Sequence, residues 1–335
     1  MSDVHARNKG RVADFTAALR TCDPASARKA VFDLFAPDAQ IQLGRPFGRL
    51  TGAQELWERV YAPLYGAMPD MERRDFIRIS GPRWNTDTPS DWVGVGGNLI
   101  GKLSRPWLGI PATDQPVFMR YHEYFRMEDG RVVEMQGLWD IPQVMLQAGV
   151  WTLPAQQGVE WMCPGPGTGE GASCRMRDPD LSARSVQQVW DMLQDVKKGT
   201  RETPESGLGG HWHDRAMWYG PTGLGTARGH SEIAGKIFHQ FRSGLSNNAR
   251  HLEEGVFFGD GPLVAFTGWP SGTAIHSGDG FLGMPASGAT LQRCSLDFWT
   301  IENGLIRECW VLVDVIDLYH QMGAETGLAA FESAI

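Results

Sequence analysis

Two periods of apolar residues alternate along this chain, and each period predicts a different kind of element. Apolar residues three to four positions apart predict amphipathic helices over 12–22, 27–36, 52–68, 184–198 and 229–245. Segments rich in aromatic and β-branched residues predict strands in two sets: 75–80, 91–99, 117–127 and 131–140, then 256–260, 263–269, 291–301 and 305–315. Helices therefore precede a meander of strands twice.

The order of elements recurs because the sequence itself recurs. Residues 107–149 align with 281–323 at an offset of 174, without a gap, and share 11 identities in 43 positions. Further upstream the offset drifts by a few residues, so that 48–61 aligns with 225–238. A repeat of this length exceeds the roughly 20–50 residues of solenoid repeats, and it indicates a whole domain used twice.

The repeat predicts an α+β fold of two tandem cone-shaped domains, each with N-terminal helices packed on a curved antiparallel sheet. The first domain is expected to span 1–150 and the second 184–335. The intervening residues 151–183 are dense in Gly and Pro, which predicts a linker. We expect the two sheets to pack together as an intramolecular pseudo-dimer, and a further homodimer is left open.

Composition narrows the function classes. The chain of 335 residues carries 31 Lys and Arg against 39 Asp and Glu, a net charge of −8, which disfavours a nucleic-acid binder. No apolar run approaches the roughly 18 residues of a membrane span, and the N-terminus shows no secretory pattern. Five scattered cysteines suit reduced thiols, so a cytoplasmic location is expected.

Three motifs, in the same order and spacing, carry a resemblance to a known family. They are Ala67-Met68-Pro69-Asp70, the segments 271–278 and 281–288, and the hairpin of 130–149 with its repeat 304–323. Together they resemble the polyketide-cyclase-like (SnoaL-like) family of the nuclear-transport-factor-2-like cone folds. The resemblance covers about 280 residues in two copies. It implies an apolar pocket, no cofactor, and acid/base chemistry on a ketone-bearing substrate.

Two aspartates occupy the same repeat position at the end of the last strand of each copy. Asp140 and Asp314 match the family position of the general acid/base, so the resemblance implies that they are catalytic. Their apolar neighbours also predict a raised pKa, which suits a proton shuttle. The alternative is that each aspartate caps the short helix that follows it. Only the second copy retains the histidine segment, which favours Asp314.

Two histidines are the predicted partners of these acids. His276 lies in the Gly-Thr…His segment, and His122 alternates with Arg120 and Tyr124 along one strand. A neutral imidazole can hydrogen-bond an enol or share a proton with an aspartate. His122 and His276 are therefore candidate catalytic residues, and Arg120 and Tyr124 candidate substrate contacts. The alternative for each histidine is a structural role with its hydrogen bonds satisfied.

Aromatic residues in and beside the strands suit a flat ligand. The predicted substrate contacts are Trp139, Trp218, Tyr219 and Trp310, although core packing is the usual role of such residues. His211 and His213 have a spacing that a metal could use, but no further ligands follow nearby, so no metal site is predicted.

Two classes of function follow. The first is a cofactor-independent enzyme that removes a proton beside a carbonyl of a polyketide-like or polycyclic substrate, as an aldol cyclase or a related isomerase or lyase. The second is a non-catalytic protein that binds a small apolar or aromatic molecule. The loss of turnover on replacing the acids would distinguish the two.

Overall fold

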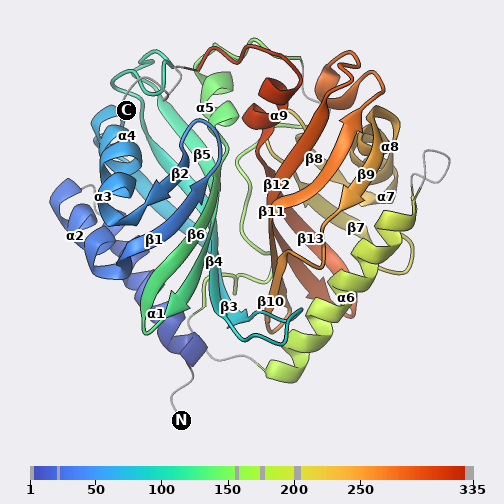
Figure 1. The fold of residues 1–335 in the computed structure, drawn as a ribbon, viewed down its shortest axis with the longest axis horizontal. Coiled ribbons are helices and arrows are strands. Elements are labelled where there is room, and N and C mark those ends of the chain that lie inside the picture. Colours follow the sequence, from blue (N-terminus) through green and yellow to red (C-terminus); the bar gives the residue numbers. More distant parts are fainter. Residues whose placement is uncertain (1–3, 21–22, 155–157, 174–177, 200–204, 329–335) are drawn as a thin grey trace.

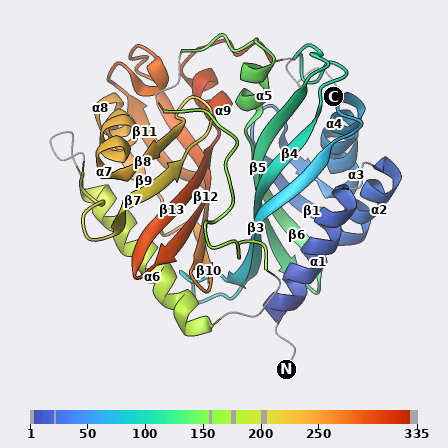
Figure 2. The ribbon, with the colours of Figure 1, turned by 180° about the vertical axis from the view of Figure 1, so that it is seen from behind.

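A computed structural model describes residues 4–20, 23–154, 158–173, 178–199 and 205–328 (Figure 1). The chain forms two α+β domains that stand side by side, each with its sheet turned toward the other domain and its helices outside (Figures 1 and 2). This arrangement buries one face of each sheet under helices and the other face against the second sheet.

The first domain begins with two helices that its sheet then follows. Asp23 caps the second of these helices by accepting hydrogen bonds from the backbone N–H groups of Ala25 and Ser26. The elements are α1 (Val4–Leu19), α2 (Pro24–Leu34), β1 (Phe35–Leu43), β2 (Gly48–Thr51), α3 (Gly52–Leu56), the π-helical turn η1 (Trp57–Tyr61), α4 (Ala62–Ala67), β3 (Glu72–Pro82), β4 (Asp91–Lys102), β5 (Pro116–Glu128), β6 (Arg131–Trp139) and α5 (Ile141–Gln147).

The second domain repeats this order after one long helix. That helix begins at Pro179 with Asp178 as its cap, upstream of residue 184, because Asp followed by Pro is a strong helix start. The elements are α6 (Pro179–Lys198), β7 (Trp212–Tyr219), β8 (Thr226–Arg228), α7 (Gly229–Glu232), the π-helical turn η2 (Ile233–Phe238), α8 (His239–Gly244), β9 (Leu245–Arg250), β10 (Val256–Asp260), β11 (Leu263–His276), the 3-10 turn η3 (Phe281–Gly283), β12 (Thr290–Glu302), β13 (Leu305–Val313) and α9 (Val315–Gln321).

The two sheets share one topology. The strand order is β2–β1–β6–β5–β4–β3 in the first domain and β10–β11–β12–β13–β7–β8 in the second, with β9 also paired to β11. Both sheets are antiparallel except at one place, where β1 pairs parallel with β6 and β7 pairs parallel with β13. The parallel pair arises because the first strand of each sheet is joined to its last strand by a long excursion through helices and hairpins.

Alternation along β5 and β12 decides which side chains belong to a domain core and which face the other domain. On β5, Phe125 packs in the core beneath the helices, whereas Tyr124 packs in a cluster shared by both sheets. On β12, Leu296 and Phe298 enter the same shared cluster. Since successive strand residues point to opposite faces, the intervening Asp297 faces the core of its own domain.

The contact between the domains is held by buried polar pairs as well as apolar packing. Lys9 of α1 forms an ion pair with Asp260 of β10 at 2.8 Å, and the same carboxylate accepts a hydrogen bond from the backbone of Ser80. The described linker residues 158–173 cross this contact, where the Trp310 indole donates to the Pro164 carbonyl. The linker thus packs as part of the interface.

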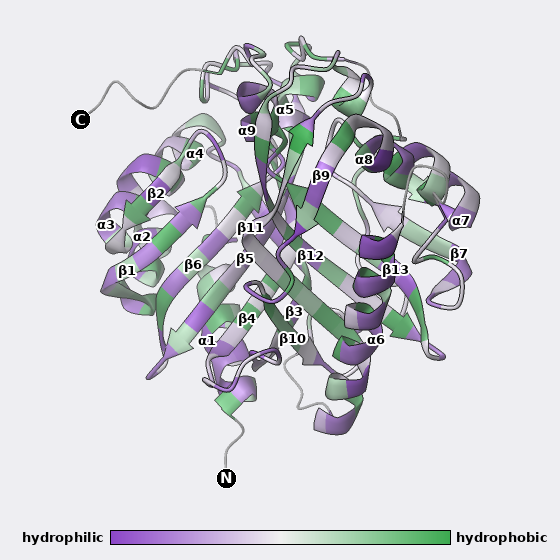
Figure 3. Cartoon of the chain, turned by 45° about the vertical axis from the view of Figure 1, so that its right-hand side comes forward, coloured by the Kyte–Doolittle hydropathy of each residue, from purple (hydrophilic) through white to green (hydrophobic). Residues whose placement is uncertain are grey.

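Helix α6 covers the outer face of the second sheet. Its buried residues recur at helical spacing, and in Figure 3 its outward face is hydrophilic while the strands beneath it alternate. The buried residues of α6 are Ser185, Val186, Val189, Met192 and Leu193. The C-terminal end of α6 reaches the cavity described next.

Candidate active site

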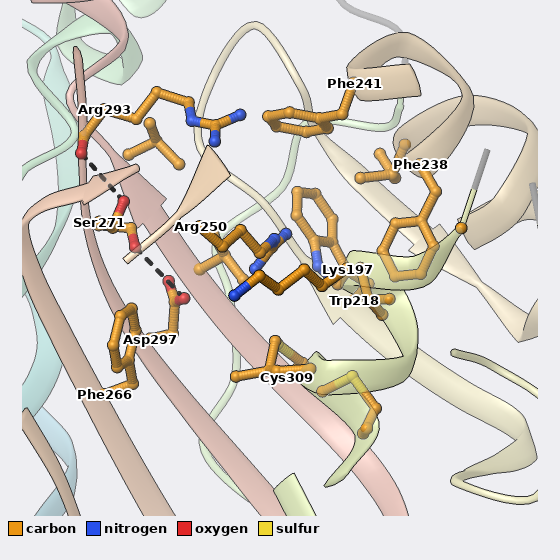
Figure 4. Close-up of a pocket in the computed structure, with 18 of the residues that line it drawn as sticks. Lys197, Trp218, Phe238, Phe241, Arg250, Phe266, Ser271, Arg293, Asp297 and Cys309 are labelled. Carbon is orange, nitrogen blue, oxygen red and sulfur yellow. Dashed lines mark hydrogen bonds between the residues drawn. The ribbon is translucent and has the colours of Figure 1, made fainter. Parts of the chain in front are cut away.

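A cavity of about 290 Å³ lies inside the second domain, between its helices and its sheet (Figure 4). Helices α6 and α8 and the turn η2 form one wall, and strands β7, β9, β11, β12 and β13 form the other. The apolar part of the lining includes Trp212, Trp218, Ile237, Phe238, Phe241, Phe266 and Trp299. The polar part includes Lys197, Arg242, Asn248, Arg250, Ser271, Arg293, Ser295 and Asp297.

Asp297 is the carboxylic acid of this cavity. It projects from the middle of β12 and is 7% exposed. Its Oδ2 accepts a hydrogen bond from the Ser295 hydroxyl at 3.5 Å, and its Oδ1 has no partner among the described residues. Burial raises the pKa of Asp297 to about 8, although the charge of Arg250 and the Ser295 bond lower it. The carboxyl is therefore poised to exchange a proton near neutrality.

Two arginines lie on the same side of the cavity as this acid. Arg293 donates from Nη2 to Asn248 Oδ1 at 2.6 Å and to the Ala249 carbonyl at 3.3 Å. Burial and the neighbouring charge of Arg250 lower the pKa of Arg293 to about 9. Arg250 and Arg293 thus place two positive charges on the wall of the cavity.

A buried indole adds a neutral donor. Trp212 of β7 is 3% exposed and lines the cavity, and its Nε1 has no hydrogen-bond partner among the described residues. A buried donor without an acceptor is costly, so a ligand oxygen that accepts from it would be favoured.

The equivalent place in the first domain holds a closed network of side chains. Glu123 stands at the repeat position of Asp297, at the offset of 174. It forms an ion pair with Arg73 at 2.8 Å and accepts a hydrogen bond from the Trp139 indole at 2.9 Å. Arg73 also binds Asp75 at 3.0 Å and lies over the Tyr121 ring. These groups satisfy one another and leave no acid free for a ligand.

Two size differences between the copies help to open the cavity in the described part of the second domain. Ser295 stands where the first domain has Tyr121, and Val313 stands where it has Trp139. Both Ser295 and Val313 line the cavity of about 290 Å³, whereas the space beside Trp139 measures only about 10 Å³. Loss of two large aromatic side chains thus opens the second domain.

Filling this space with the side chain of the other copy should close the site. We expect Val313→Trp to abolish saturable binding of an aromatic fluorescent probe such as 1-anilinonaphthalene-8-sulfonate, since the indole would occupy the cavity. Fluorescence titration measures this. Val159→Trp is the matched control because Val159 is 59% exposed, and it should leave binding unchanged. Unaltered binding in V313W would contradict the assignment of the cavity.

The aspartates predicted from the sequence lie at the contact between the domains. Asp314 Oδ2 accepts from the backbone N–H of Arg45 at 2.8 Å, and Asp140 Oδ2 accepts from that of Thr222 at 3.0 Å. Arg45 and Thr222 follow the equivalent strands β1 and β7, at the offset of 177 that relates 48–61 to 225–238. Each aspartate therefore binds the repeat-equivalent residue of the other domain, as a pseudo-twofold relation requires.

Neither of these aspartates is among the cavity residues. Burial raises the pKa of both Asp140 and Asp314 to about 7. The capping alternative describes Asp314, whose Oδ1 accepts from Asp317 N at 3.1 Å, but Asp140 makes no such bond to α5. A catalytic role for either stays a prediction.

The predicted histidines are buried outside the cavity. His276 Nδ1 lies 2.9 Å from the Ser287 hydroxyl, and burial lowers the pKa of His276. His122 Nδ1 lies 2.7 Å from the Leu296 carbonyl of the other domain, and burial with the charge of Arg120 lowers its pKa well below the usual value. In each ring Nε2 has no partner among the described residues.

The predicted substrate contacts separate into three places. Trp218 lines the cavity, and Trp139 packs in the core of the first domain. The others lie where the domains meet: Tyr219 and Trp310 stack with ring centroids 5.3 Å apart, Arg120 Nη1 donates to the Tyr219 carbonyl at 2.9 Å, and the Tyr124 hydroxyl donates to the Asp297 carbonyl. A strand pattern does not state which face is covered by the second domain.

Asp297, Arg250, Arg293 and Trp212 were not predicted from the sequence. A signal for the acid was present, because the repeat places Glu123 and Asp297 at one position inside two apolar strands. Arg293 lies on the same strand as Asp297 at an even spacing, which places the two on one face. No comparable signal marked Arg250, since its approach depends on the pairing of β9 with β11.

Metal ligation finds no support in the part of the chain that the structure describes. No group of three or more His, Cys, Asp or Glu residues is placed there to hold a metal ion. His211 instead lies 2.8 Å from the Asp195 carboxylate. Cys163 is a buried free thiol, and Cys174 lies outside the described residues.

Comparison with known proteins yields similarity of structure alone. No family model matches the chain, and no curated protein matches its sequence. A candidate SnoaL-like polyketide cyclase from Jannaschia sp. CCS1 is 22% identical, covering 43% of this chain and 93% of its own, with a TM-score of 0.36. The candidate polyketide cyclase IdmH of Streptomyces antibioticus is 25% identical, with coverage of 41% and 98% and a TM-score of 0.33.

An NTF2-like protein from Burkholderia xenovorans LB400 is 19% identical, covering 42% of this chain and 97% of its own, with a TM-score of 0.33. The chain is similar in structure to SnoaL-like polyketide cyclases and NTF2-like proteins. The internal repeat and the two sheets, rather than these similarities, establish the two-domain architecture.

Among the described helices, none combines the length and the apolarity needed to cross a bilayer.

Proposed function

We propose that the second domain catalyses acid/base chemistry on a small carbonyl compound, with Asp297 as the base that forms an enolate. One observation carries this proposal: the Asp297 carboxyl is buried in a cavity, with one oxygen unpartnered among the described residues and a cation nearby. A group whose pKa lies near the working pH transfers protons efficiently.

The proposed reaction begins at the carbon beside the carbonyl. The C–H bond breaks, its proton passes to a carboxylate oxygen of Asp297, and its electron pair moves onto the carbonyl oxygen. The Trp212 indole N–H, which has no partner among the described residues, is the donor available to that oxygen. Donors fixed in a site of low polarity stabilise an enolate more strongly than water does.

The second half of the reaction returns the proton. In a substrate whose enolate is conjugated with a double bond, the proton returns to a different carbon, which is isomerisation. In a substrate with a second carbonyl, the enolate carbon attacks that carbonyl, which is an aldol cyclisation. In the second case the new alkoxide takes the proton from Asp297. Both outcomes regenerate the carboxylate, and no electron acceptor is needed.

A direct test measures proton exchange rather than a named product. Small 1,3-diketones, β-hydroxyketones and keto acids are incubated with the protein in D₂O, and loss of the α-proton signal is followed by NMR, with a chelator present. Exchange that depends on Asp297 supports the proposal. Tight binding without exchange across the panel would instead indicate a non-catalytic binding protein.

The same assay separates the three candidate acids. We expect Asp297→Asn to lower the exchange rate by about 10²–10⁴-fold, and Asp314→Asn and Asp140→Asn to retain it. The reverse pattern would assign the base to the aspartates at the domain interface. These two variants are also matched controls, because each removes one buried carboxyl whose pKa is raised.

A further inference from the structure

The cavity of the second domain is lined by more positive charges than its acidic residue Asp297 can neutralise. Among the residues that the structure describes, the charged lining residues are Lys197, Arg242, Arg250 and Arg293 against Asp297. The chain as a whole has a net charge of −8. A cationic cavity in an acidic protein concentrates anions, and its low-polarity walls strengthen the attraction.

The interior arginine is fixed in place as a binding group. Arg293 is 6% exposed, its Nη2 is bound to Asn248 and Ala249, and its guanidinium lies 5.9 Å from the Phe241 ring centre (Figure 4). The charge of Arg250 lowers its pKa further than burial alone. An anion bound between the two guanidinium groups would remove this repulsion.

The second domain has an arginine, Arg293, at a position where the first domain has the uncharged residue Met119. Arg293 pairs with Gly272 across β12 and β11, whereas the repeat-equivalent Met119 pairs with Leu99 across β5 and β4. A Cβ atom on Gly272 would lie 2.6 Å from Nη2 of Arg293. Gly272 therefore makes the room that the guanidinium occupies, and the two positions differ together.

We propose that the ligand of this cavity is a compact ketone that also carries a carboxylate, with the carboxylate held by Arg293 and Arg250. The apolar lining suits a body of one or two rings, since about 290 Å³ is at the lower end of small-molecule sites. The inference rests on the proposed function for the reaction at the carbonyl. The charge of the ligand is tested by binding alone.

The test compares a keto acid with its neutral analogue. Calorimetry below pH 7 measures the affinity of 4-oxo-4-phenylbutanoate and of the corresponding amide for the full chain. We expect the acid to bind about tenfold more tightly or better, because charge-assisted hydrogen bonds replace neutral ones. In Arg293→Met this ratio should fall toward one, and Arg293→Lys should retain part of it. Met is the residue that the first copy has at this position, so R293M is expected to fold.

Arg307→Gln is the matched control, since Arg307 lies outside the cavity beside Glu302, and it should keep the full preference. Equal affinities for acid and amide, a preference that survives in R293M, or no binding of the acid at millimolar concentration would each overturn the inference. Deuterium exchange at the α-carbon of the same compound tests the proposed function independently of the binding measurement. An acid that binds through Arg293 without exchange would refute the reaction and leave the ligand class standing.

Discussion

Replacing Asp297 by asparagine will lower turnover by about 10²–10⁴-fold, the usual contribution of a positioned general base. The amide is close in size to the carboxyl but cannot accept the proton. The rate of α-proton exchange measured by NMR, on the compound that exchanges fastest with the unaltered protein, provides the number. Asp314→Asn and Asp140→Asn serve as controls, and a loss in either of them with D297N unaffected would contradict the assignment.

The pH dependence of the exchange rate distinguishes a base from an acid at position 297. Because the pKa of Asp297 is raised to about 8, the acid is mostly protonated at neutral pH and becomes an effective base as pH rises through that value. The rate should therefore increase up to about pH 8 and then level off, and D297N should lose this rise. A rate that falls over the same range would show that Asp297 acts as an acid instead.

The free energy of unfolding should fall over the pH range in which the exchange rate rises. In the unfolded chain Asp297 loses its proton near its ordinary pKa of about 3.9, while in the folded chain it keeps it to about 8. The folded state thus binds more protons in this window, so the free energy of unfolding falls as pH rises through it. D297N should lack this contribution and be no less stable than the unaltered protein at pH 8. A D297N protein that fails to fold would point to a structural role.

The second large effect is a loss of stability when the buried ion pair in the first domain is broken. Arg73→Met will lower the free energy of unfolding by about 3–5 kcal/mol, because it leaves Glu123 buried without its cation. Arg73 and Glu123 are 2% and 0% exposed and pair at 2.8 Å. Urea unfolding followed by circular dichroism measures the change.

Two comparisons make that result specific. Arg74→Met removes an arginine from the next position of the strand, where its pair with Glu72 is largely exposed, and should cost less than about 1 kcal/mol. The double variant Arg73→Met with Glu123→Leu should recover part of the loss, since it removes the buried charge of Glu123 while Asp75 keeps its ion pair with Arg78 at 2.6 Å. Equal effects of R73M and R74M would show that the buried pair contributes little.

The sequence by itself determined the architecture. The repeat at an offset of 174 and the order of helical and strand periods specify two α+β domains, because these patterns are local and each copy reinforces the other. Even the acid position was within reach, since Glu123 and Asp297 align. The resemblance pointed instead to Asp140 and Asp314, which the fold places at the contact between the sheets.

Only the tertiary structure decided which face of each strand is a site. Tyr124 and His122 alternate with Glu123 on one strand, and pattern alone assigns neither set to a pocket. The packing of the second sheet covers one set, and the helices enclose the other. Whether that enclosed space is open then depends on side-chain volume at positions far apart in the sequence. Ser295 and Val313 leave room where Tyr121 and Trp139 fill it, and such long-range packing is set by three-dimensional contact rather than by local pattern.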